Sequence, residues 1–219
     1  MANSTGISLT WRPAAALPLI LLGGMAQAAA VSCQNQEIVI DARPGMEVDY
    51  RNNNAVLRDV VITQCDMRIQ AEEARVVGGL NFESGQLTVT GDVRIAAEGG
   101  NLSSDKAVIS FRDRLITRAT ITGSPAQFEQ KRDDGSTSRG RAGTIDYLAA
   151  DGTVSFSDEA WITPDGKNQI SGRAFVYNIR LQRMEGQPKS ATTEKSGKDR
   201  IRIVIPAPDP GEKEEEKKQ

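Results

Sequence analysis

Histidine is absent from this chain of 219 residues. Its absence removes the commonest general base, the Ser–His and Cys–His nucleophile pairs, and the commonest metal ligand. Aromatic residues amount to only 5%, and the formal net charge of −2 gives no basic excess of the kind that a nucleic-acid partner requires. Helical periodicity is also weak throughout. Of the common catalytic chemistries, only those based on carboxylates remain to be considered.

Adjacent carboxylates do occur, but their spacing does not suit catalysis. Glycoside hydrolysis needs two carboxyl groups held across one bond, whereas neighbouring residues of a strand point to opposite faces. The serine clusters lack a base partner, and the glycine-rich turns do not follow the strand–loop–helix pattern that cradles phosphate. We therefore expect no enzymatic activity, no catalytic residue, no bound metal and no cofactor. The carboxylate pairs in question are Glu72–Glu73, Asp133–Asp134 and Asp158–Glu159.

Long hydrophobic runs are also lacking, apart from one near the N-terminus. There AAALPLILLGGMA is too short to span a bilayer and leads into Ala26-Gln27-Ala28, a small-x-small cleavage pattern. We predict that residues 1–30 are a cleaved signal peptide, cut after Ala28 or Ala30, and that the protein is exported. A retained membrane anchor is the alternative. The predicted mature domain, residues 31–206, is long enough for one continuous core.

Cysteine occurs twice, at Cys33 and Cys65. In an exported protein such a pair is most often a disulfide. Alternatively, Ala30-Val31-Ser32-Cys33 reads as a lipoprotein cleavage box with Cys33 acylated, or both thiols are free. A metal site made from two cysteines alone is not expected.

What the chain does contain is a repeated alternating strand. In QLTVTGDVRIA, residues 86–96, the apolar side chains of Leu87, Val89, Val93 and Ile95 share one face, and Gly91 marks a place where we expect the wall to bend. Related stretches are AVLRDVVIT, LITRATITG and TVSFSDEAWIT. Turn sequences such as Gly-Gly and Asp-Gly separate them. This pattern predicts an all-β meander, sandwich or solenoid.

The apolar side chains of these strands would line one continuous interior. Packed tightly, that interior is an ordinary core; left partly open, it is a trough suited to acyl chains. Periodicity does not choose between the two. The predicted interior residues are Leu87, Val89, Val93, Ile95, Ile109, Phe111, Leu115, Ile121, Val154, Phe156, Ile162 and Val176.

Apolar, β-branched strands are predicted near both ends of the domain, at residues 38–42 and 201–205. Unpaired strand edges invite pairing with another chain. We predict that these two edges form an interface, with Ile38 and Ile40 at one end and Ile201, Ile203 and Ile205 at the other. The charged tail, residues 207–219, is predicted to be disordered.

The segment from Ser124 to Gly186 carries an ordered set of motifs: P-A-x-F, G-x-A, a tyrosine, a strand and I-x-G-x-x-x-x-Y, followed by RIRIVIPAP. Together with GDVRI and IVIDARPGMEVDY upstream, it resembles the LptA/OstA family of periplasmic lipopolysaccharide transport proteins. The resemblance implies a single twisted antiparallel β-jellyroll, open at both ends, with lipid A acyl chains inside. The cysteine pair is not part of that pattern.

The resemblance also implies partners. Proteins of this family bind lipopolysaccharide, join head to tail, and join related jellyrolls on inner-membrane and outer-membrane components to form a bridge. It implies no catalytic residues. Three alternatives remain. From the residues they are a β-solenoid envelope module with a packed core and a carbohydrate-active enzyme on a β scaffold, and among the family's relatives there is the membrane-anchored jellyroll partner of the same transport system.

Overall fold

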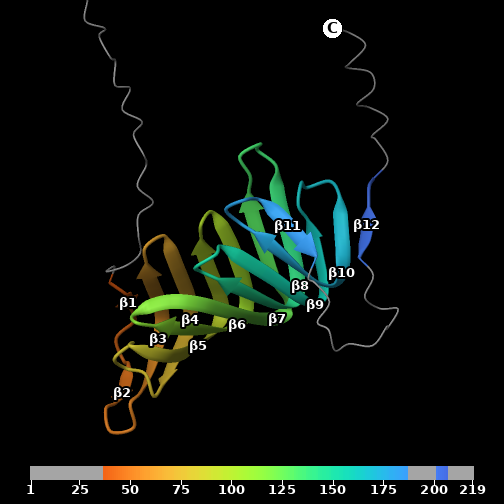
Figure 1. Cartoon of the computed structure of the whole chain (residues 1–219). Coiled ribbons are helices and arrows are strands. Elements are labelled where there is room, and N and C mark those ends of the chain that lie inside the picture. The colour runs from red at the N-terminus through yellow and green to blue at the C-terminus, as the bar shows by residue number, and fades with distance from the viewer. Residues whose placement is uncertain (1–36, 187–200, 207–219) are drawn as a thin grey trace, which may run out of the picture. The chain divides into compact units, whose positions relative to one another are not determined.

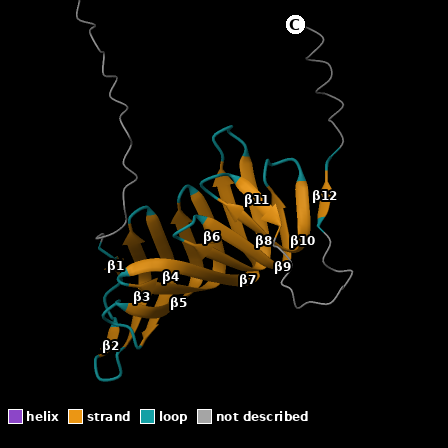
Figure 2. Ribbon diagram, viewed as in Figure 1, coloured by secondary structure: helices purple, strands orange, loops and turns teal. Residues whose placement is uncertain are grey.

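The computed structural model describes residues 37–186 and 201–206 of the chain. The predicted signal peptide, residue Cys33 and the predicted disordered tail lie outside these ranges, so those predictions stay predictions. Throughout the described ranges the regular secondary structure is strand, as Figure 2 shows. None of the described residues forms a helix that is long and apolar enough to cross a membrane.

The strands form one antiparallel sheet of 12 strands, in which chain neighbours are mostly sheet neighbours. The order is β1-β3-β4-β5-β6-β7-β8-β9-β10-β11, with β2 also paired to β3 and β12 also paired to β10. Figure 1 shows this progression from the orange end of the sheet to the blue end. The strands are β1 (Val39–Asp41), β2 (Glu47–Asp49), β3 (Asn54–Gln64), β4 (Met67–Val77), β5 (Ser84–Ala97), β6 (Gly100–Arg112), β7 (Leu115–Lys131), β8 (Thr137–Leu148), β9 (Thr153–Thr163), β10 (Gln169–Asn178), β11 (Arg183–Gly186) and β12 (Arg202–Val204).

Turn chemistry sets where the hairpins end. The Gly-Gly and Asp-Gly turns, and the turn predicted from Asn52-Asn53-Asn54, each contain a residue at positive φ, a conformation that glycine and asparagine adopt most readily. These residues are Asn53, Gly78, Gly99, Gly135, Gly152 and Gly166. The turns predicted from the sequence are therefore present as expected.

A line of bends crosses the sheet near the middle of its long strands. Gly91 and Asp92 both have positive φ, and the pairing of β5 shifts register between Thr90 and Val93. Similar shifts interrupt β4, β6, β7, β8 and β10 at neighbouring positions. Because bulges bend a strand and increase its twist, we call this line the crease. The bend predicted at Gly91 is confirmed.

The crease divides the sheet into two layers that remain continuous through it. Some segments that the sequence pattern predicts as separate short strands, such as residues 115–121 and 126–130, are the two halves of one long strand, here β7. The first layer runs from β2 to β11 through residues 54–58, 73–77, 86–90, 106–112, 115–122, 144–148, 153–157 and 174–178. The second layer runs from β1 to β12 through residues 60–64, 67–70, 93–97, 100–104, 126–131, 137–142, 160–163 and 169–172.

Aromatic contacts show that the two layers face each other. The ring of Phe128, in the second layer, lies 5.7 Å from the ring of Phe156 and 5.6 Å from the ring of Tyr177, both in the first layer. The apolar side chains between the layers form one buried cluster. The fold is thus a single folded antiparallel sheet, an all-β jellyroll, as the sequence analysis predicted.

Candidate functional site

The candidate site is the apolar space between the two layers. Most of the predicted interior residues line it and are at most 3% exposed: Leu87, Val89, Val93, Ile95, Ile109, Phe111, Ile121, Val154, Phe156 and Ile162. They come from β5, β6, β7 and β9, so the row crosses several neighbouring strands. The interior is filled by the protein's own side chains, several of which, including Ile109 and Phe156, have no exposed surface.

Two predicted interior positions are wrong by one residue. Leu115 is only half-buried and pairs with the exposed Arg112, whereas Ile116 is buried. The pairing of β6 with β7 shifts register next to this pair, because Phe111 pairs with Ile116 but Ser110 pairs with Arg118. This irregularity leaves Leu115 on the outer face, as a bulge changes which face a residue occupies.

In β10 the inward residues are Phe175 and Tyr177, and Val176 between them is half-buried. Val176 pairs with Ser155, while Phe175 pairs with Phe156. In a run of three consecutive apolar residues, the sequence does not show which alternate positions face inward. The register shift between Gly172 and Ala174 then moved the inward set by one position.

Sequence reasoning also missed several interior side chains. Phe128 lies in the P-A-x-F motif, where the alternate spacing of the alanine and the phenylalanine could have marked it as facing inward. Tyr147 and Tyr177 are almost wholly buried even though they carry hydroxyl groups. Burial, aided by the nearby Glu98 carboxylate, raises the pKa of the Tyr147 phenol above its ordinary value.

The long side opposite the crease is where the hairpin turns of both layers lie, and we call it the mouth. The backbone hydrogen bonds of the described turns there stay within one layer, for example from Ala149 N–H to the Thr117 carbonyl. Side chains provide the connections between layers. The Gln64 amide donates to the Arg114 carbonyl at 2.7 Å and accepts from the Ile116 N–H at 2.8 Å.

Gln130 makes a second connection across the mouth. Its amide nitrogen donates to the Ile179 carbonyl at 3.1 Å, and its amide oxygen accepts from the Tyr177 hydroxyl at 2.8 Å. Gln64 and Gln130 are only 5% and 4% exposed. The apolar interior therefore ends in a rim of satisfied polar groups.

A third connection is an ion pair between Glu98 and Arg180. The Arg180 guanidinium donates to both carboxylate oxygens of Glu98, with the Nε–Oε2 distance 2.8 Å. It also donates to the carbonyls of Ala149 and Ala150, each at 2.8 Å. The hydrogen bond to Glu98 raises the pKa of Arg180. One guanidinium thus ties the β5–β6 turn of the second layer to two turns of the first layer.

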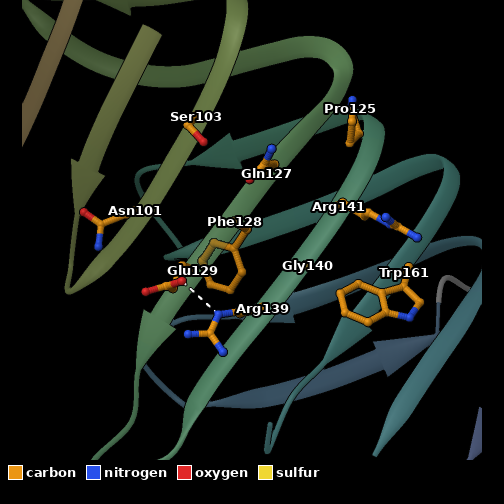
Figure 3. Close-up of a pocket in the computed structure, with 10 residues that line it drawn as sticks. All are labelled: Asn101, Ser103, Pro125, Gln127, Phe128, Glu129, Arg139, Gly140, Arg141 and Trp161. Atoms are coloured by element: carbon orange, nitrogen blue, oxygen red, sulfur yellow. Dashed lines mark hydrogen bonds and ion pairs between the residues drawn. The ribbon is translucent and has the colours of Figure 1, made fainter. Parts of the chain in front are cut away.

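The outer surface carries a separate hollow, shown in Figure 3, with a volume of about 400 Å³. Its walls are mixed polar and apolar, and they include Gln127, Arg141 and the ion pair between Arg139 and Glu129, whose Nε–Oε2 distance is 2.9 Å. Trp161 is half-buried on this outer face, where the Arg141 guanidinium lies 5.2 Å from its ring. This hollow is distinct from the apolar interior.

The carboxylate pairs do not form a convergent site. Asp158 and Glu159 lie exposed in the crease, and Asp133 and Asp134 lie in an exposed turn. Hydrogen bonds from Ser136 hold the pKa of Asp134 below its ordinary value, as expected for a turn that it caps. In the part of the chain that the structure describes, no group of three or more His, Cys, Asp or Glu residues could hold a metal ion.

Cys65 is disulfide-bonded, at the turn between β3 and β4. The only other cysteine of the sequence is Cys33, which lies outside the described residues. The predicted Cys33–Cys65 pairing remains a prediction.

The two ends of the folded sheet differ from its middle in exposure. Ile40 of β1 pairs with the buried Ile62, and Ile203 of β12 pairs with the buried Ile170, so both continue the inward row. Ile203 is nevertheless 61% exposed. Ile38 also packs against the core, and Ile201 and Ile205 are exposed beside β12. The apolar row therefore continues into the edge strands at both ends, and its last residues at the C-terminal end are exposed.

These features define a class of protein: a folded antiparallel sheet whose apolar row reaches the edge strands at both ends. Residues 77–183 match the family model described as LptA/(LptD N-terminal domain) LPS transport protein. The matched residues include all of β5 to β10. This match, over just under half of the chain, confirms the resemblance to LptA/OstA-like lipopolysaccharide transport proteins seen in the sequence.

A solved structure is also similar: LptH from Pseudomonas aeruginosa, described as the LptA-homologous periplasmic component of the conserved lipopolysaccharide transport device. It is 21% identical, with 80% of this chain and 99% of that chain covered and a TM-score of 0.48. No curated protein matches the chain.

Proposed function

We propose that this protein carries lipopolysaccharide through the periplasm, with the acyl chains held between the two layers of the sheet and no catalytic step. The observation that carries the proposal is the continuous apolar row from β5 to β9, in a chain that contains the lipopolysaccharide transport domain. Each buried methylene contributes about 0.8 kcal/mol, so acyl chains strongly favour such an interior over water.

The closed packing sets a condition on binding. Since Val89, Ile109 and Phe156 have no exposed surface, acyl chains enter only when the layers separate. Separating the layers exposes these side chains and so has a free-energy cost. Acyl chains that fill the space between the layers bury the side chains again and offset that cost. Lipid binding and layer separation are thus one coupled equilibrium.

The ends of the sheet support head-to-tail assembly. In the second layer β1 runs from the mouth toward the crease, and β12 runs the opposite way. In the first layer β2 and β11 are likewise opposed. Docking the C-terminal edge of one copy on the N-terminal edge of the next would therefore continue both layers with antiparallel pairing.

Such a junction also continues the interior. Ile203 and Ile40 face inward in the second layer, and Met184 and Val48 pair with the buried Tyr177 and Ala55 in the first. A contact between unlike edges propagates instead of closing. We infer that copies of this chain, and jellyroll components at the inner and outer membranes, join in this way into a bridge.

Native mass spectrometry of the purified chain with lipopolysaccharide tests the carrier function. We expect a complex that survives competition by the same glycolipid stripped of its acyl chains, because the acyl chains supply the binding energy. A chain that binds the stripped saccharide equally well would contradict an interior site.

A further inference from the structure

We propose that the mouth is the lateral entrance for acyl chains and that the Glu98–Arg180 ion pair is the latch that holds it closed. This inference rests on the proposed function and specifies how the carrier loads. It follows from the way in which the two layers are joined on their two long sides.

The crease and the mouth differ in what would have to break for the layers to separate. At the crease, long strands such as β5 and β7 run unbroken from one layer to the other. At the mouth, side chains connect the described turns of the two layers, among them those of Gln64, Gln130 and the Glu98–Arg180 pair. The crease is thus the hinge, and the mouth is the side that opens.

Among these connections, the Glu98–Arg180 pair is built from charges at the surface of the rim. The Glu98 side chain is 16% exposed and that of Arg180 is 46% exposed, whereas both glutamines are almost fully buried. Water can therefore solvate the separated ions at once, and the pair breaks at lower cost than a buried one. Its residues are 82 apart in the sequence, so the contact serves no local turn.

The surroundings hold the latch in one geometry. A Cβ atom at Gly152 would clash with Glu98 Oε2 and would lie 2.9 Å from Arg180 Cγ, so only glycine leaves room for the pair. The Asp66 carboxylate accepts the Glu98 N–H at 3.0 Å, which fixes the turn that presents Glu98. These contacts position the two charges without tying the layers together themselves.

The latch is tested by E98Q and R180Q in the full chain, with E129Q as the matched control. Glu129 forms an exposed ion pair with Arg139 between β7 and β8 within one layer, so its loss leaves the mouth unchanged. We expect each latch variant to raise the initial rate of lipopolysaccharide loading by about two- to fivefold, the range that a partly exposed ion pair supplies. E129Q should load at the wild-type rate.

Hydrogen exchange provides a second readout that needs no lipid. We expect faster amide exchange in turns 98–99 and 149–152 in both latch variants, and not in E129Q, because the mouth opens more often. R180K is a milder variant that keeps the charge but loses the bidentate geometry, and it should show an intermediate effect if R180Q folds poorly.

The outcomes separate the two proposals. If wild type loads lipopolysaccharide and the latch variants load no faster, acyl chains enter by another route and the latch is overturned while the carrier function stands. If wild type binds no lipopolysaccharide, the carrier function fails and the latch falls with it.

Discussion

At the scale of single residues, glycine sets how closely the two layers approach. A Cβ atom at Gly140 would lie 2.7 Å from Phe156 Cε1, and one at Gly100 would lie 3.1 Å from Phe128 Cε2 and from Ile179 Cδ1. In both places an aromatic ring occupies the space that a side chain would need. The interior is therefore packed to contact across the layers.

We predict that Gly140→Ala destabilises the protein by about 1–3 kcal/mol, the usual cost of overpacking a core. Urea unfolding followed by circular dichroism measures the change. Combining it with Phe156→Leu should cost less than the sum of the two single changes, because the smaller side chain vacates the contested space. An unfolding midpoint equal to that of wild type for Gly140→Ala would show that the layers are not in contact at this point.

Residue-level prediction from the sequence succeeded where alternation was regular. In β5, Leu87, Val89, Val93 and Ile95 are all buried, as their spacing indicated. It failed at Leu115 and Val176, because a register shift alters the inward parity and leaves no mark in the hydrophobic pattern. The contacts of Gln64, Gln130 and Arg180 were also invisible, since they join residues far apart in the sequence.

At the scale of the strands, the crease converts one sheet into two layers. The sequence indicated strands and turns correctly but divided several long strands into two. The polar residues at the crease, such as Asp158 and Glu159, resemble a turn in sequence, and both adopt positive φ. At a hairpin the two flanking segments pair with each other, whereas at a bend both continue to pair with the neighbouring strands. A single sequence does not show which segments pair.

The short edge strand β12 gives a prediction about assembly. Ile203→Pro should weaken self-association about fivefold for each ladder hydrogen bond lost, at about 1 kcal/mol per bond, because proline cannot donate to a strand partner. The unfolding midpoint should change little, since Ile203 is 61% exposed and its strand has 3 residues.

Sedimentation velocity measures this assembly, with Ile203→Val as the control that keeps the N–H and the apolar shape. We expect the control to assemble as wild type does. Unchanged sedimentation of Ile203→Pro would rule out pairing through β12.

At the scale of the whole described domain, two properties make it suited to act as a conduit. Its apolar interior is continuous along the sheet, and its two ends are unlike edges whose strand directions suit antiparallel pairing between copies. The family resemblance read from the sequence pointed to this arrangement, whereas hydrophobic periodicity alone left a sealed core and a trough equally possible.

Site-specific photo-crosslinking tests the central claim, that acyl chains lie between the layers, most directly. A photoreactive residue replaces Val93, Ile109 or Phe156 inside, or Arg94 or Arg112 on the exposed face, and lipopolysaccharide is added before irradiation. We predict crosslinks from the three interior positions and few or none from the two arginine positions. Labelling confined to Arg94 and Arg112 would contradict the account.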